Sequence, residues 1–168
     1  MKVRGLPTKR QATALMHETK TYGDNMTNHI TLEQANKICT AALTKGTELG
    51  LKPLGVVVLD PGGHMIAFQR QDGASTLRPQ IATAKASGAL AMGFSSRKIG
   101  DLAAERPSFV ASLGPISVHG VVPAAGGVIV VDGQGRPIGA VGISGDTSDN
   151  DEICTLAGIS AAGLTAQS

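Results

Sequence analysis

Residues 126–146 constrain the fold of this chain more than any other stretch. Two apolar runs within 127–144 flank a tight, glycine-rich turn, which is the pattern of a β-hairpin. The second run leads into a glycine–serine loop, and residues 149–152 then look like the start of a helix. Glycines gather where backbone must turn sharply or approach another group closely. A strand, a small-residue loop and a helix N-terminus together predict one wall of a small-molecule site.

A second hairpin is predicted earlier in the chain. Residues 54–59 form a continuous valine-rich run that is typical of a buried strand. The sequence Asp60-Pro61-Gly62-Gly63 has the chemistry of a turn, and residues 64–70 follow as the second arm. Hairpins, rather than strand–helix–strand crossovers, indicate an antiparallel sheet with helices packed on it.

Four helices are predicted, over residues 32–49, 80–92, 96–105 and 150–164. The first opens with a capping box in which Thr31 is the N-cap and Gln34 its partner, and Gly50 suits its end. Residues 106–126 are expected to be irregular, with 116–122 as a source for a fifth strand. The predicted order is α-β-β-α-α-β-β-α, an α/β fold of the α+β kind.

Composition and charge exclude several classes of protein. The 168 residues suit one domain, residues 29–168, after a poorly ordered extension, residues 1–28. Hydrophobic residues make up 42% and aromatic residues 2%, which leaves little surface for stacking nucleobases. Five basic and two acidic residues give 1–25 a charge of +3, whereas ten basic and eleven acidic residues give the rest −1. The domain therefore predicts no nucleic-acid or membrane partner.

Cysteine usage and hydropathy point to a cytoplasmic protein. Cys39 and Cys154 each fall in a predicted helix and are expected to be buried free thiols rather than a disulfide framework. No run of 18 apolar residues would span a membrane, and the basic N-terminus lacks the apolar core of a secretory signal.

Several motifs, taken in order, resemble one known family. They are Leu59-Asp60-Pro61-Gly62-Gly63-His64, Arg70-Gln71-Asp72-Gly73-Ala74, Ala84-Lys85-Ala86, Pro123-Ala124-Ala125-Gly126-Gly127-Val128 and Gly139-Ala140-Val141-Gly142-Ile143-Ser144-Gly145-Asp146. With them the chain resembles the GlcG-like proteins, which include the haem-binding HbpS proteins and the C-terminal domain of PduO-type corrinoid adenosyltransferases. The resemblance implies a profilin-like three-layer α/β/α fold, a five-stranded antiparallel sheet and a homo-oligomer. It also implies haem as a possible ligand.

Two histidines are the candidate catalytic residues. His64 follows the first predicted turn, where its imidazole could project into a cleft as a haem-iron ligand or a proton shuttle. A surface turn histidine is the plain alternative. His119 lies in the irregular segment and could equally be structural. Metal-ligand spacings such as His-x-x-x-His or Cys-x-x-Cys are absent from the sequence, and the acidic residues around 146–152 do not match a calcium loop.

Basic and small polar residues are the candidate ligand-binding groups. Arg78 and Lys85 stand seven residues apart on one helix face and could grip a carboxylate or a haem propionate, unless they form a solvated face. Lys85 lies between alanines, which favours partial burial. The full set of predicted ligand-binding residues is Arg70, Arg78, Lys85, Gly126, Gly127, Ser144 and Asp146.

Three functions remain open from the sequence. The first is a soluble, oligomeric small-ligand-binding protein that holds haem or a related planar carboxylated ligand, with His64 on the iron. The second is a cofactor-independent lyase or isomerase that acts on a small aromatic or short-chain acid, with His64 or His119 as general base. The third is a structural partner domain with an empty groove.

Overall fold

The computed structural model describes residues 29–168; the predicted extension, residues 1–28, lies outside the described part. Five strands form one antiparallel sheet in the order β2-β1-β4-β3-β5. The strands are β1 (Gly55–Leu59), β2 (Met65–Arg70), β3 (Gly127–Val131), β4 (Pro137–Ser144) and β5 (Thr165–Ala166). The described helices are α2 (Leu32–Glu48), α3 (Arg78–Met92), α4 (Ser96–Glu105), α5 (Pro107–Ile116) and α6 (Ser148–Ala161).

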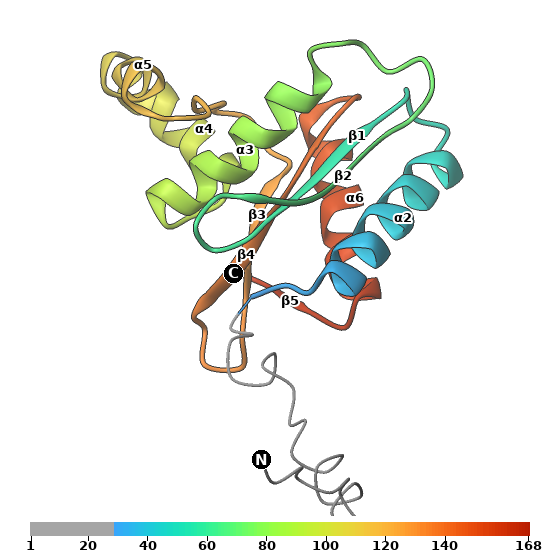
Figure 1. Ribbon diagram of the computed structural model, residues 1–168. Helices are drawn as coiled ribbons and strands as arrows, with labels where there is room; N and C mark the ends of the chain where they lie inside the picture. The colour runs from blue at the N-terminus through green and yellow to red at the C-terminus, as the bar shows by residue number, and fades with distance from the viewer. Residues whose placement is uncertain (1–28) are drawn as a thin grey trace, which may run out of the picture.

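Helices cover both faces of the sheet, which confirms the predicted three-layer α/β/α fold. Figure 1 shows α2 and α6 together on one side of the strands and α3 on the other. In β1, Val56 and Val58 pack in the core under α2 and α6, whereas Val57 and Leu59 pack with the alanines of α3. Alternate side chains of a strand point to opposite faces, so a strand buried on both faces is apolar without a break.

Local sequence signals set the ends of most elements. Thr31 and Gln34 form the predicted capping box, with Gln34 N–H donating to Thr31 Oγ1 at 3.2 Å and Thr31 N–H donating to Gln34 Oε1 at 2.9 Å. Helix α3 ends at Gly93, whose φ of 77° is a conformation that glycine adopts without a Cβ penalty. Both predicted hairpins are present, with β1 paired to β2 and β3 paired to β4.

Two predictions of local structure are wrong. Residues 107–116, expected to be irregular, form helix α5, which begins at a proline suited to a first helical turn. Residues 116–122 form no strand; the fifth strand is the two-residue β5 at the other end of the chain, paired with Val130 and Val131. The predicted element order therefore lacks α5 and β5.

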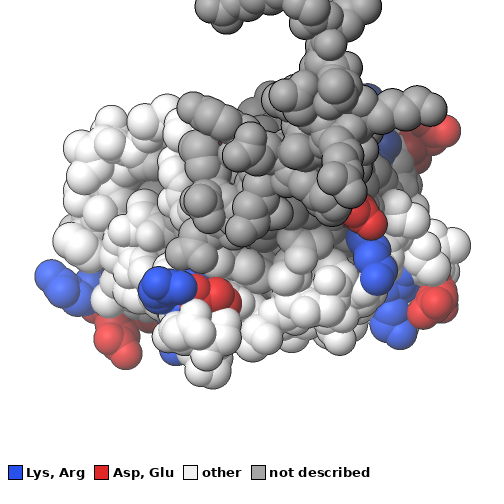
Figure 2. All heavy atoms as spheres, turned by 60° about the horizontal axis from the view of Figure 1, so that its bottom comes forward, with Lys and Arg blue, Asp and Glu red and all other residues white. Residues whose placement is uncertain are grey.

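Surface and core features agree with the composition. Cys39 and Cys154 are buried free thiols, as predicted, and burial raises the pKa of each to about 11. On the face in Figure 2, blue and red residues lie beside one another near the edge, and most of the visible described surface is uncharged. Within residues 29–168, no helix has the length and hydropathy needed to cross a lipid bilayer.

Candidate functional site

A pocket of about 580 Å³ lies where the β1–β2 turn, the C-terminal half of α3, helix α5 and the loop after α5 come together. Its walls are mostly apolar, with Leu90 and Met92 from α3 facing Leu113 and Ile116 from α5. Backbone glycines of the turn complete one side. Pockets of this size and character are typical small-molecule sites.

The pocket brings together the two histidines that the sequence singled out. His64 comes from the β1–β2 turn and His119 from the loop after α5, and both line the pocket. The side chain of His64 is 82% exposed, so its imidazole stands at the mouth rather than on the floor. Two imidazoles at the mouth of an apolar pocket could ligate a metal centre or transfer a proton.

Asp60 holds the ring of His64. The Nδ1 atom of His64 lies 3.2 Å from both carboxylate oxygens of Asp60. Burial raises the pKa of Asp60, but hydrogen bonds from the backbone N–H and ring of His64 outweigh it, and the pKa falls below its usual value. The turn therefore carries a paired carboxylate and imidazole in which Nε2 makes no hydrogen bond within residues 29–168.

Ser87 is a pocket residue that sequence reasoning did not identify. It lies on α3, it is 9% exposed, and its hydroxyl has no hydrogen-bond partner within the described part of the chain. A buried hydroxyl without a partner has lost its hydrogen bonds to water and gained none from the protein, which costs free energy. Such groups are often found where a ligand or water completes the bond. No sequence signal distinguishes Ser87 from the other small residues of α3.

The predicted basic residues lie elsewhere. Arg78 is in the first turn of α3 and donates to Ser144 Oγ at 3.1 Å. The pocket residues of α3, from Ser87 to Met92, are nine to fourteen positions further on, which at 1.5 Å per residue is a rise of about 14 to 21 Å along the helix. Arg70, the exposed last residue of β2, pairs with Gly55 at the same end of the sheet as Ser144. The structure does not bring these groups and the histidines to one pocket.

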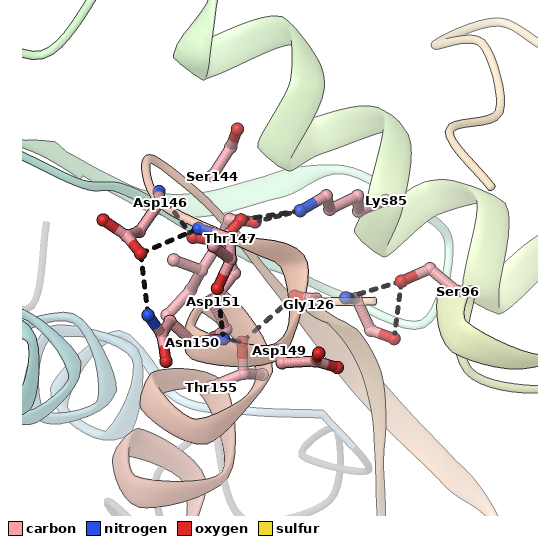
Figure 3. A network of polar contacts seen from close by, with 12 residues as sticks. Lys85, Ser96, Gly126, Ser144, Asp146, Thr147, Asp149, Asn150, Asp151 and Thr155 are labelled. Atoms are coloured by element: carbon pink, nitrogen blue, oxygen red, sulfur yellow. Dashed lines mark hydrogen bonds and ion pairs between the residues drawn. The ribbon is translucent and has the colours of Figure 1, made fainter. Parts of the chain in front are cut away.

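Lys85 forms a buried ion pair inside the fold. Figure 3 shows its side chain reaching from α3 to Asp151, one of two acidic residues in the first turn of α6. Its Nζ atom donates to Asp151 Oδ2 at 2.8 Å and to the carbonyl of Ile143 at 3.0 Å. Lys85 is 3% exposed and Asp151 1% exposed. Burial raises the pKa of Asp151, while the hydrogen bond from Lys85 acts in the opposite direction. The predicted partial burial of Lys85 is thus an almost complete burial with a partner.

Asp146 organises the start of α6. Its carboxylate accepts hydrogen bonds from Asn150 Nδ2 at 2.7 Å, from Thr147 N–H at 2.8 Å and from Lys52 N–H at 3.1 Å. These bonds lower the pKa of Asp146 to about 2. Figure 3 shows Asp146 beside Thr147 and Asn150 at the start of α6.

The two glycines at the start of β3 allow close packing. A Cβ atom on Gly126 would lie 2.9 Å from the Cβ of Asp151 and 3.1 Å from Nζ of Lys85. A Cβ atom on Gly127 would collide with the carbonyl of Lys85 and lie 2.8 Å from Oγ of Ser96, which accepts from Gly127 N–H. These glycines hold α3 and α6 against the sheet, and they do not line the pocket.

Metal binding by protein side chains alone finds no support in the described residues. Within 29–168, no three or more His, Cys, Asp or Glu residues come together as a metal site. The two histidines could ligate a metal only if it arrived with other ligands of its own, as the iron of a haem does.

Comparison with known proteins identifies the family. The family profile described as "Haem degrading protein HbpS-like" matches residues 30–160. An uncharacterized 15.0 kDa protein of the dhaT-dhaS intergenic region of Citrobacter freundii is 32% identical over 124 residues, which cover 74% of this chain and 85% of that protein.

Solved structures share the fold. A crystal structure of HbpS matches with a TM-score of 0.68 and 28% identity, covering 79% of this chain and 89% of that one. Klebsiella pneumoniae protein ORFY matches with a TM-score of 0.72 and 26% identity, covering 80% and 90%. A PduOC–haem complex has the same fold, with a TM-score of 0.74, 22% identity, and 83% and 99% coverage. This chain belongs to the HbpS-like family, as the sequence motifs predicted.

Proposed function

We propose that this protein binds haem, or a comparable planar apolar ligand, in the pocket between α3 and α5. The observation that carries the proposal is the meeting of His64 and His119 at the mouth of one apolar pocket. The histidines come from segments far apart in the chain, and neither is needed by the core.

The residues present fit such a ligand. The volume of about 580 Å³ lies in the range of sites for cofactors and small molecules, and the apolar walls suit a macrocycle. An imidazole nitrogen is a common protein ligand of haem iron, and bound haem would supply a redox-active, ligand-binding iron. The unpartnered hydroxyl of Ser87 adds a polar group that a ligand or water could satisfy.

Family membership supports the same ligand. The family profile is named for haem degradation, and the solved PduOC structure of the same fold is a complex with haem. The apolar pocket of this chain would supply the binding site for such a ligand.

The predicted role of Arg78 and Lys85 at the propionates is not part of this proposal. Arg78 lies about 20 Å from the far end of α3, and Lys85 is occupied by Asp151. No Lys or Arg side chain from the described residues lines the pocket. A carboxylated ligand would therefore keep its charged end in solvent, where water stabilises it. The expectations of a homo-oligomer and a cytoplasmic location stay predictions.

A titration with haemin tests the proposal. We expect a Soret shift that saturates at stoichiometric loading, and an affinity at least about ten-fold weaker in His64→Ala, because the imidazole that would bind the iron is lost. His29→Ala is the matched control, since His29 is exposed and outside the pocket. An unchanged Soret band in the wild-type protein, or equal binding in His64→Ala and His29→Ala, would contradict the proposal.

The pairing of Asp60 with His64 favours a second candidate, a cofactor-independent lyase or isomerase acting on a small carboxylic acid. A carboxylate that orients an imidazole is a common arrangement for a general base. Turnover of such an acid by the haem-free protein, abolished in His64→Ala, would support this function over the first.

A further inference from the structure

The turn that carries His64 is organised by one carboxylate. Asp60 Oδ1 accepts hydrogen bonds from Gly62 N–H at 2.8 Å and from His64 N–H at 2.9 Å. The backbone closes the same turn, with Asp60 N–H donating to the carbonyl of His64 at 2.8 Å and Gly63 N–H donating to the carbonyl of Asp60 at 3.0 Å. The backbone hydrogen bonds to its carboxylate are therefore enough to explain why an aspartate stands at this position.

The β3–β4 hairpin repeats this turn bond for bond. Asp132 Oδ1 accepts from Gln134 N–H and from Arg136 N–H, both at 2.9 Å. Asp132 N–H donates to the carbonyl of Arg136 at 2.9 Å, and Gly135 N–H donates to the carbonyl of Asp132 at 3.0 Å. The Arg136 side chain also donates to Asp132 Oδ2, from Nε at 2.8 Å.

The two turns differ in the side chain that pairs with the aspartate, and this difference shows which residues the turn structure shares and which belong to the pocket. Both turns have an aspartate at the first position that bonds the backbone of the turn, and in both its carboxylate also pairs with the side chain four residues on. Four residues after the aspartate, one hairpin has arginine and the other has histidine. An imidazole is therefore not required by the turn, and it occurs in the turn that lines the pocket.

Pairing with a carboxylate gives the imidazole a defined tautomer. A neutral imidazole has one N–H donor and one lone-pair nitrogen, and the carboxylate can only accept. With Nδ1 placed 3.2 Å from both oxygens of Asp60, a neutral ring would carry its proton on Nδ1 and its lone pair on Nε2. Histidines that ligate metals commonly donate their other ring N–H to a carboxylate in this way, which orients the ring and raises its basicity.

The second pocket histidine lacks such a partner. Within residues 29–168 the ring of His119 makes no hydrogen bond, and its residue is exposed. No hydrogen bond from the described residues therefore selects one tautomer or orientation of its ring. Of the two, only His64 has its free nitrogen fixed before a ligand arrives, which reduces the entropy lost on binding.

We propose that Asp60 is a positioning residue that fixes His64 as the Nδ1–H tautomer with Nε2 free, so that His64 rather than His119 would supply the protein ligand to the iron of a bound haem. The inference rests on the proposed function for the haem. Its structural half, the tautomer and orientation of His64, concerns the ligand-free protein.

The test compares Asp60→Asn with Asp132→Asn. Each substitution keeps Oδ1 as a carbonyl acceptor for the backbone bonds of its turn. It removes the negative charge and replaces Oδ2, one of the two oxygens beside Nδ1 of His64 and the acceptor of Nε of Arg136, with an N–H donor, so the two variants perturb matched turns. Nitrogen-15 NMR of the ligand-free protein, under conditions where the spectra show a neutral ring, reports the tautomer of His64. We expect the Nδ1–H form in the wild-type protein and in Asp132→Asn, and a shift toward Nε2–H in Asp60→Asn.

Haemin binding supplies the second measurement. We expect Asp60→Asn to weaken binding about 10- to 100-fold, as loss of the outer partner of a metal-binding histidine usually does, with Asp132→Asn unchanged. Equal thermal midpoints for the two variants would show that the fold is not the cause. A wild-type Nε2–H ring, or equal haem affinity in the two variants, would overturn the inference.

The two hypotheses fail separately. If the wild-type protein takes up no haemin, the proposed function fails, whereas the NMR measurement still decides whether Asp60 fixes the ring. If haemin binds but His64 has the other tautomer, or His119→Ala alone abolishes binding, the role of Asp60 fails while the haem site stands.

Discussion

At the scale of single residues, Lys85 shows what a sequence can and cannot reveal. Flanking alanines indicate partial burial on a helix face, and the side chain is indeed buried. Its partner Asp151 stands 66 residues away in the chain, and no local pattern connects them. Lys85 was expected to bind the carboxylate of a ligand, but it binds a carboxylate of the protein itself.

Removal of Lys85 should cost stability. Lys85→Met leaves the carboxylate of Asp151 buried without its partner, and breaking a buried pair in this way typically costs about 3–5 kcal/mol. The double variant Lys85→Met with Asp151→Asn removes the unpaired charge as well, so we expect it to recover part of the loss. Urea unfolding of the three proteins measures both effects. A Lys85→Met protein as stable as the wild type would contradict the structural role.

At the scale of elements, the packing of α3 on the sheet depends on small residues. Gly142 of β4 faces the helix, and a Cβ atom there would collide with the carbonyl of Ala82 and lie 3.0 Å from the Cβ of Ala86. The helix can approach this closely only because neither surface carries a large side chain. The spacing in turn sets where the far end of α3, with Leu90 and Met92, meets the pocket.

Gly142→Ala should therefore destabilise the protein, by about 1–3 kcal/mol, since overpacking a tight contact forces backbone to shift. Gly133→Ala is the control, because nothing lies within 4 Å of a Cβ atom at that turn position. Denaturant midpoints of the two variants measure the difference. If both variants unfold at the same midpoint as the wild type, the close packing of α3 is not limiting.

Elements with a strong local pattern could be predicted, and the others could not. The valine-rich strands, the capping box at Thr31 and the end of α3 at Gly93 follow from neighbouring residues. Helix α5 contains Gly114 and Pro115 near its end, and these residues favour an irregular reading. Strand β5 has two residues, too few for any periodicity, and exists because its neighbour β3 offers an edge.

At the scale of the whole molecule, the pocket is assembled from segments that the sequence keeps apart. His64 and His119 could each be singled out from their turn or loop context, but their meeting depends on how the β1–β2 turn and the loop after α5 lie around the C-terminal half of α3. The glycines of 126–127, predicted to line a ligand crevice, serve instead the contact between helix and sheet. The sequence therefore indicates which side chains could do chemistry more readily than it indicates which of them lie together.

Helix α5 should be the least protected part of this assembly. Among the described elements it packs only against α4, and Ile116 at its end is 81% exposed. A helix with few buried contacts opens locally at low free-energy cost. Hydrogen–deuterium exchange should therefore be faster in 107–116 than in α3, and haemin should slow it if the ligand bridges the two. Equal protection of α5 and α3 in the free protein would contradict this expectation.

The attachment of α5 through α4 alone has a kinetic consequence. Because α5 packs only against α4 among the described elements, we expect the residence time of a ligand held between α3 and α5 to depend on how often α5 opens at the junction of Arg106 and Pro107. Arg106 already stacks its guanidinium 4.6 Å from the ring centre of Phe109, one turn into the helix. We therefore expect substitutions at Arg106 or Pro107 to change the residence time of the ligand, although neither residue lines the pocket.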